Sequence, residues 1–299
     1  MAYFMSIRPI NLFIIGCTQI LVYYLFFHSS NMLPGQQWVL EPPKIFIFTL
    51  VTMCIAASGY LINDYVDFDS DIVNSKKHRL ERKHDNLRFY VCITLIGFLV
   101  SVWFALDMNK PMLSLIYVLS VASLFFYSTH LKKTVLLGNV VVSLFSSGVL
   151  GILLFAENSL LNQQMEAVKS HIYSSVLLFC LFAFLVSMVR EIVKDVEDVH
   201  GDKINGYRTL PVNYGIGISR KIAFGFTLII LVMLLYVLFK GFQSSDISLI
   251  TYLIGGLILP VCLIGYMLTQ PSFEENANRI SKWCKLLMLS GLILLIIVH

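Results

Sequence analysis

Long apolar runs alternate with short polar segments along the whole chain, and this pattern predicts helices that cross a membrane. Each run has about 17–25 mainly apolar residues, which is the length a helix needs to cross a hydrocarbon core of roughly 30 Å. The runs are continuously apolar rather than alternating, which favours helices over the strands of a membrane barrel. We place nine of them near residues 9–27, 43–63, 89–106, 112–129, 135–156, 172–192, 221–240, 248–268 and 283–298.

The composition agrees with a membrane protein. Of the 299 residues, 57% are hydrophobic and 13% are charged, and the mean hydropathy is +0.78, a balance that soluble domains rarely reach. No segment has the composition of a separate soluble domain, so we expect residues 1–299 to form a single membrane-embedded domain. The first apolar run lacks a small-residue cleavage site, and we interpret it as a retained span rather than a signal peptide.

The basic residues predict how the chain is oriented. With the N-terminus in the cytoplasm, eighteen of the 22 Lys and Arg residues fall on the cytoplasmic side, where positive charge normally concentrates. The net charge of +4 is explained by this bias and requires no nucleic-acid partner, and nothing in the sequence implies a protein partner. The six cysteines lie within or beside apolar runs, without the spacing of a metal site or a disulfide framework.

Two acidic clusters each follow an apolar run and begin a long cytoplasmic segment. They read NDYVDFDSD at 63–71 and REIVKDVEDVHGD at 190–202. Both contain the spacing D-x2-D-x3-D. If each helix continues through its cluster, aspartates at this spacing lie on one face of the helix. The aspartates concerned are Asp64, Asp67 and Asp71 in the first cluster and Asp195, Asp198 and Asp202 in the second.

These carboxylates predict a site for cations. Six of them around one cavity would repel one another, and an aspartate at membrane depth costs about 2.5–3.5 kcal/mol. Oxygen ligands without Cys or His favour hard cations, and Mg²⁺ commonly shares its ligands with substrate phosphate. Lys132, Arg190, Lys194 and the KKHR run at 76–79 would neutralise an anion nearby. The sequence therefore predicts a diphosphate that Mg²⁺ bridges to both aspartate sets.

Four segments resemble the signatures of the UbiA-type intramembrane prenyltransferases. Asn63-Asp64-x-x-Asp67-x-x-x-Asp71 resembles the first aspartate motif of that family, and REIVKDVEDVHGD, continuing to TLP at 209–211 and YG at 214–215, resembles the second. YSTHLK at 127–132 with GN at 138–139 is similar to the middle signature, and RPIN at 8–11 is similar to the N-terminal start. One departure follows Asn74: the family has N-x-P-x-R-P, whereas this chain reads NSKKHR, which places Arg79 one position late.

The resemblance implies nine helices around a central cavity, capped by two aspartate-bearing cytoplasmic loops. It also implies transfer of a prenyl group from a prenyl diphosphate to a lipophilic acceptor, with two Mg²⁺ ions held by the six aspartates. The second motif is most similar to the branch that prenylates geranylgeranylglyceryl phosphate, and an aromatic acceptor such as a quinone precursor is the alternative. The substrate-binding residues that the resemblance and the neighbouring charges suggest are Asn63, Lys132, Arg190, Lys194, Arg79, Tyr127 and Asn11.

A secondary transporter is the main hypothesis from a different class of protein. Carboxylates inside membranes often mark ion or proton pathways, but transporter sites usually lie near the bilayer midplane. The predicted topology places both acidic clusters of this chain at one membrane face, with many basic residues nearby. We therefore favour a multi-pass enzyme of isoprenoid lipid synthesis in a bacterial or archaeal cell membrane, with its active site facing the cytoplasm.

Overall fold

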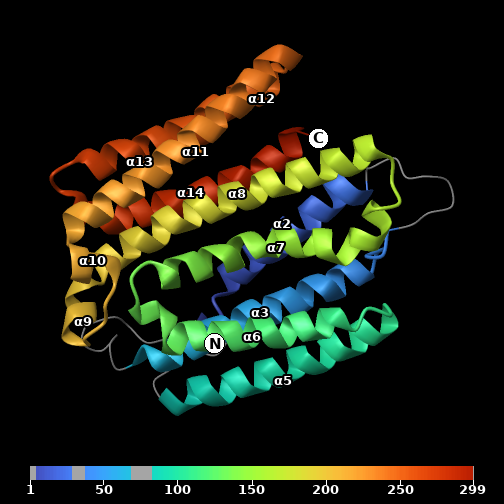
Figure 1. Cartoon of the computed structure of the whole chain (residues 1–299), viewed down its shortest axis with the longest axis horizontal. Helices are drawn as coiled ribbons and strands as arrows, with labels where there is room; N and C mark the ends of the chain where they lie inside the picture. The colour runs from blue at the N-terminus through green and yellow to red at the C-terminus, as the bar shows by residue number, and fades with distance from the viewer. Residues whose placement is uncertain (1–4, 29–37, 69–82, 299) are drawn as a thin grey trace. The chain divides into compact units, whose positions relative to one another are not determined.

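The computed structural model describes residues 5–28, 38–68 and 83–298, and the regular elements in these ranges are all helical (Figure 1). Within these ranges nine helical segments are long and apolar enough to cross a membrane, which confirms the expected all-helical membrane fold. The segments are Pro9–His28, Lys44–Val66, Lys83–Asp107, Met112–Lys133, Leu137–Leu161, Glu166–Glu197, Ile216–Ser244, Ile247–Thr269 and Phe273–Ile297.

Several helices are longer than the apolar runs that predicted them. Helix α5 (Lys83–Asp107), which forms the third span, begins with the polar segment KHDNLR. Helix α14 (Phe273–Val298) begins with the polar segment FEENANR. Hydropathy detects only the part of a helix that lies in hydrocarbon, whereas the backbone hydrogen bonds continue into the polar ends. The charged residues at these ends therefore lie on helices rather than in loops.

The chain divides into two compact units, which are described separately here. The first contains Met1–Lys132 and Val149–Val176, and the second contains Lys133–Gly148 and Leu177–His299. Two helices contribute to both units: α7 (Leu137–Leu161) and α8 (Glu166–Glu197). The single domain expected from the sequence stays a prediction.

In the first unit, helix α3 (Lys44–Val66) is the central helix. It packs against α2 (Pro9–Val22), α5 and α6 (Met112–Thr129), and α5 also packs against α6, an arrangement visible in Figure 1. A π-helical turn, η1 (Tyr23–His28), extends α2 and buries Tyr23, Phe26 and Phe27. A short 3₁₀ turn, η2 (Leu131–Lys133), follows α6.

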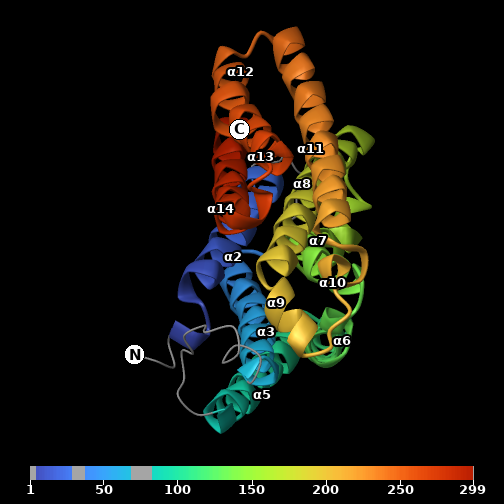
Figure 2. The same cartoon turned by 90° about the vertical axis from the view of Figure 1, so that its left-hand side faces the viewer.

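In the second unit, α8 is followed by two short helices, α9 (Val199–Ile204) and α10 (Leu210–Tyr214), and then by α11 (Ile216–Ser244) (Figure 2). The next span combines α12 (Ile247–Tyr252), the π-helical turn η3 (Leu253–Ile258) and α13 (Leu259–Thr269). Helix α13 packs against both α11 and α14. Buried Leu, Ile and Val side chains of α8, α11, α13 and α14 form one continuous core.

The two helices that carry the acidic clusters end inside them. Helix α3 ends at Val66 with Asp67 as its C-cap, and α8 ends at Glu197, with Asp198 in the turn before α9. The amides of Asp67 and Asp198 still bond to the carbonyl oxygens of Asn63 and Lys194, each at 2.9 Å. In the second cluster the third aspartate, Asp202, lies on α9, so the expected helical stripe on α8 extends only as far as Asp198. Asp71, the third aspartate of the first cluster, lies outside the described residues.

Candidate active site

The first motif is built from the last turn of α3 and the turn after α6. Asn63 Nδ2 donates a 2.7 Å hydrogen bond to Asp67 Oδ2, and Lys132 Nζ forms an ion pair with the same oxygen. Lys132 Nζ also lies 3.4 Å from Asn63 Oδ1. Asp67 is only 6% exposed, so its negative charge is compensated within the protein. The structure thus brings together three of the residues that the sequence predicted for the site.

Arg8 joins this group from the start of α2. Its Nη2 lies 2.6 Å from Asp64 Oδ1, and its guanidinium lies over the Tyr60 ring, 4.7 Å from the ring centroid. The backbone of Arg8 is left-handed, with φ of 54°, although residues before proline strongly prefer extended conformations. Strain of this kind persists only where surrounding contacts hold it, and the contacts with Asp64 and Tyr60 hold it here.

The second motif begins on α8. Asn139, on the part of α7 that belongs to the same unit, donates a 2.8 Å hydrogen bond from Nδ2 to Asp195 Oδ2. Asn139 is only 6% exposed, and a buried amide in an apolar helix requires such a partner. The contact fixes the position of the Asp195 carboxylate relative to α7.

The two cations of the second motif share one carboxylate. Arg190 Nη1 is paired with Glu191 Oε1, and Lys194 Nζ lies 3.7 Å from Glu191 Oε2. Within the described chain, the Nε atom of Arg190 is buried without a hydrogen-bond partner. Arg190 and Lys194 are therefore positioned mainly by Glu191, a residue that the sequence analysis did not assign to the site.

The last two aspartates lie on the turn and the short helix that follow α8. The amide of Asp202 bonds to the Asp198 carbonyl oxygen at 3.0 Å. The Thr209 hydroxyl donates to Asp202 Oδ2 at 3.1 Å, and the Tyr207 amide donates to the Asp202 carbonyl oxygen at 2.8 Å. These bonds hold the segment between α9 and α10 against the end of the motif.

Of the remaining residues predicted for the site, two are half-buried on helices and two lie outside the described ranges. Tyr127 is half-buried near the end of α6, and Asn11 is half-buried in the first turn of α2. Asp71 and Arg79 lie outside the described residues. The prediction that the two motifs face each other across one cavity is not tested by units that are described separately, and it stays a prediction.

Three residues contact the predicted site although they were not assigned to it: Arg8, Asn139 and Thr209. Arg8 and Asn139 had a detectable signal, because both are polar residues at or inside apolar runs, where they are costly without partners. Thr209 stands just before α10 and begins the TLP segment that resembles the end of the second motif, which was the signal that could have identified it.

The oxygen atoms at both helix ends match the preferences of magnesium. Mg²⁺ is typically held by one or two carboxylates together with water and substrate phosphate, and Asp64 with Asp67, or Asp195 with Asp198, would supply that number. Among residues 5–28, 38–68 and 83–298, no three His, Cys, Asp or Glu side chains gather into a complete metal cage. The residues present therefore fit an ion that completes its coordination with substrate oxygens.

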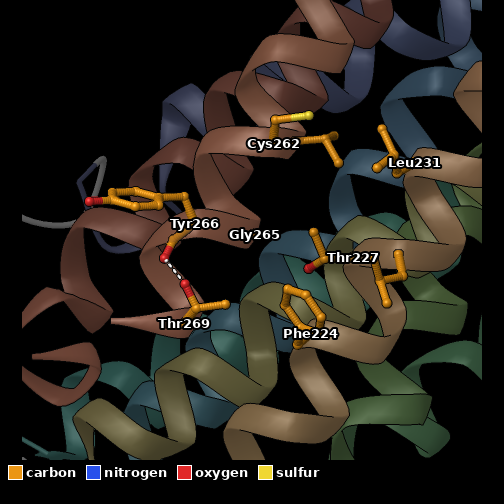
Figure 3. Close-up of a pocket in the computed structure, with 9 residues that line it drawn as sticks. Phe224, Thr227, Leu231, Cys262, Gly265, Tyr266 and Thr269 are labelled. Carbon is orange, nitrogen blue, oxygen red and sulfur yellow. Dashed lines mark hydrogen bonds between the residues drawn. The ribbon is translucent and has the colours of Figure 1, made fainter. Parts of the chain in front are cut away.

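A separate pocket of about 240 Å³ lies between α11 and α13 (Figure 3). Its lining residues are uncharged, and the hydroxyls of Thr227 and Thr269 are already bonded to the carbonyl oxygens of Ala223 and Tyr266 at 2.9 and 2.8 Å. Such a lining suits hydrocarbon rather than a diphosphate. It consists of Phe224, Thr227, Leu228, Leu231, Val261, Cys262, Gly265, Tyr266 and Thr269.

Comparison with solved structures gives fold neighbours over nearly the whole chain. One comes from work on digeranylgeranylglyceryl phosphate synthase in membranes; it shares 21% identity and a TM-score of 0.64, over 99% of this chain and 96% of that one. Another is a UbiA homolog from Archaeoglobus fulgidus bound to GPP and Mg²⁺, with 14% identity, a TM-score of 0.50 and 99% of each chain covered. At these identities the likeness shows a shared fold and nothing more.

The profile of the UbiA prenyltransferase family matches residues 22–289, which span both units. The chain belongs to this family and is a multi-pass membrane prenyltransferase. It is 31% identical over 262 residues to the digeranylgeranylglyceryl phosphate synthase of Sulfurisphaera tokodaii, with 87% of each chain covered. It is 36% identical over 184 residues to the enzyme of the same name from Methanopyrus kandleri, with 62% of this chain and 63% of that one covered.

Proposed function

We propose that this protein transfers a geranylgeranyl group from its diphosphate to geranylgeranylglyceryl phosphate. Relatives from archaea that bear the name digeranylgeranylglyceryl phosphate synthase support this acceptor, because they match most of the chain at about one-third identity. The order Arg-Glu-x-x-Lys-Asp in the second motif favours the same branch of the family. The magnesium-bound homolog supports Mg²⁺ as the cofactor, and we propose two ions, one for each aspartate set.

One structural observation carries the proposal: the two motifs have the same local construction. Each ends a long apolar helix, places its middle aspartate directly after the last helical residue, and has basic side chains in ion pairs at that helix end. A repeated acidic helix end with compensating cations is suited to hold a polyanion through metal. A solvated helix end would need neither the buried Asp67 nor the buried Asn139.

The roles of the residues follow from these positions. Asp64, Asp67, Asp71, Asp195, Asp198 and Asp202 would hold the magnesium ions. Lys132, Arg190 and Lys194 would donate hydrogen bonds to the diphosphate and stabilise the negative charge that grows as the diphosphate leaves. Asn63 would orient Asp67, and Arg8 would orient Asp64. When bound, magnesium would act as a Lewis acid that neutralises the leaving group.

In the transfer step, the allylic C–O bond breaks and its electron pair remains on the diphosphate. The acceptor hydroxyl oxygen forms the new C–O bond and releases its proton. The apolar helices would surround the prenyl chain and exclude water from the carbocation-like carbon. We place this site at the cytoplasmic face and treat both units as one catalytic domain, in line with the basic residues that surround the motifs.

The proposal is tested with the purified full chain in lipid nanodiscs, supplied with radiolabelled geranylgeranyl diphosphate and Mg²⁺. Three acceptors are compared: geranylgeranylglyceryl phosphate, 4-hydroxybenzoate and a naphthoquinone precursor. We expect a magnesium-dependent radiolabelled product with the first acceptor. A product formed only with an aromatic acceptor would reassign the branch, and no transfer to any acceptor with donors of several chain lengths would refute the proposal.

A further inference from the structure

Glu191 occupies a central position among the charges of the second motif. Its two carboxylate oxygens contact different cations: Oε1 contacts Arg190 Nη1, and Oε2 lies 3.7 Å from Lys194 Nζ. The Glu191 side chain is only 11% exposed, and those of Arg190 and Lys194 are 19% and 38% exposed. One nearly buried carboxylate therefore bridges two basic side chains that remain partly accessible.

A bridging carboxylate has two physical effects on these cations. It offsets the repulsion between two positive charges that lie close together on one helix. It also restricts two long side chains that would otherwise sample many rotamers, which matters because donors that are fixed in advance stabilise a developing charge best. Arg190 Nε has no hydrogen-bond partner within the described chain, so removing Glu191 would remove the ion pair through Nη1 that holds this guanidinium.

We infer that Glu191 is a positioning residue, which holds Arg190 and Lys194 in the geometry that receives the diphosphate. The inference rests on the proposed function, because it requires the two cations to contact that anion. Glu191 itself would touch neither the substrate nor the metal. Its two carboxylate oxygens contact the two cations, whereas the carboxylate of Asp195 on the next turn accepts from Asn139.

A positioning role and a simple electrostatic role predict opposite results. If Glu191 acted only as a negative charge near an anion site, its neutralisation would strengthen binding of a diphosphate. If it positions the cations, its neutralisation weakens binding. A purely structural role would lower the thermal stability and leave the affinity of the folded protein unchanged.

The test measures binding of inorganic pyrophosphate by calorimetry, with the full chain in nanodiscs and Mg²⁺ present. We expect Glu191→Gln to raise the pyrophosphate Kd about 10-fold, a change of roughly 1.4 kcal/mol. Glu191→Asp keeps the charge but is one methylene shorter, so its pyrophosphate Kd should lie between those of the parent and Glu191→Gln. If Glu191→Gln does not fold, Glu191→Asp serves as the test variant. The matched control is Glu197→Gln at the end of the same helix, where the exposed carboxylate accepts from Asn278 Nδ2 at 2.9 Å and the Kd should not change.

A double-mutant cycle shows whether Glu191 acts through its partner. We expect Glu191→Gln to weaken pyrophosphate binding less in the Lys194→Gln background than in the parent protein, because the part of its effect that acts through Lys194 is already lost and only the part through Arg190 remains. An unchanged or lower Kd in Glu191→Gln, or fully additive losses, would overturn the inference. If Lys194→Gln and Asp198→Asn reduce prenyl transfer while Glu191→Gln binds normally, only this inference fails. If the parent protein does not bind pyrophosphate at all, the proposed function fails with it.

Discussion

Replacement of Glu157 by alanine should destabilise the first unit. Glu157 lies near the C-terminal end of α7 and belongs to neither aspartate motif. Glu157 is fully buried and accepts two backbone hydrogen bonds: from the amide of Val39 to Oε2 at 2.9 Å and from the amide of Leu40 to Oε1 at 2.7 Å. These amides belong to the segment that leads into α3. The carboxylate thus ties the beginning of one helix to the end of another.

The expected loss can be worked out from these two bonds. A hydrogen bond to a charged group contributes about 1.5–3 kcal/mol, so two contribute roughly 3–6 kcal/mol. Removing the carboxylate also removes the cost of burying its charge, and the net loss should be about 2–4 kcal/mol. Lys110 adds to the loss: burial lowers its pKa and the Glu157 charge opposes this shift, so the lysine charge becomes costlier in the alanine variant. Glu157→Gln keeps one oxygen acceptor and should lose about half as much.

The free energy of unfolding is measured by SDS titration of the detergent-solubilised protein, and amide hydrogen exchange is measured across residues 38–41. We expect faster exchange in that segment for Glu157→Ala, with little change in α11 or α14. Glu166→Ala is the matched control, because the Glu166 side chain is 85% exposed and lies 4.0 Å from Lys169. If Glu157→Ala unfolds at the same SDS fraction as the parent, with unchanged exchange at residues 38–41, the reasoning is refuted.

Three further predictions concern the site and the packing of the helices. Asp67→Asn and Asp198→Asn should each reduce prenyl transfer more than 100-fold while the circular dichroism spectrum stays unchanged. EDTA should abolish transfer until Mg²⁺ is restored. Full activity in either variant would contradict the metal assignment. Lys132→Met should lower kcat/KM for the prenyl diphosphate about 100-fold, which is the usual cost of removing one donor to a developing charge. Lys133→Met is the control and should have little effect, because the Lys133 ammonium lies 5.1 Å from the Tyr207 ring centroid. Gly97→Ala should lower the free energy of unfolding by about 1–3 kcal/mol through overpacking, because an added Cβ would contact the Tyr117 hydroxyl and lie 2.8 Å from Cys54 Cβ. The control in the same SDS titration is Gly148→Ala, because the described chain leaves open space around Gly148.

The architecture was predictable because the bilayer imposes one strong rule on the chain. Each of the nine apolar runs of spanning length gives a spanning helix in the part of the chain that the structure describes, since backbone polar groups in hydrocarbon must be satisfied within each segment. The helix ends were less predictable, because hydropathy does not follow a helix into its polar turns. The break at Asp198 is an example: KDVEDVHGD has no Gly or Pro before Gly201 that would mark the end of α8 at Glu197.

The site was predictable by residue type and only partly by contact. The spacing of the aspartates and the basic residues nearby identified Asn63, Asp67 and Lys132, which the structure brings together. The pairing of Lys194 with Glu191 required three-dimensional information, because Asp195 and Asp198 also lie within four residues of Lys194 in the sequence. Arg8 was missed for a similar reason: 56 residues separate it from Asp64, and no local pattern predicts that contact.

The partners of the buried polar groups separate structural carboxylates from functional ones. Glu157 is bound by backbone amides, which cannot leave it unless the chain itself moves. Asp64, Asp67 and Asp195 are bound by the side chains of Arg8, Lys132 and Asn139, which can change rotamer without disturbing a helix. A carboxylate whose partners can rotate is able to exchange them for a metal or a substrate, whereas one held by the backbone is fixed. By this criterion Glu157 stabilises the fold, and we propose that the aspartates at the ends of α3 and α8, rather than Glu191 with its two cationic partners, are the groups that exchange partners for a metal.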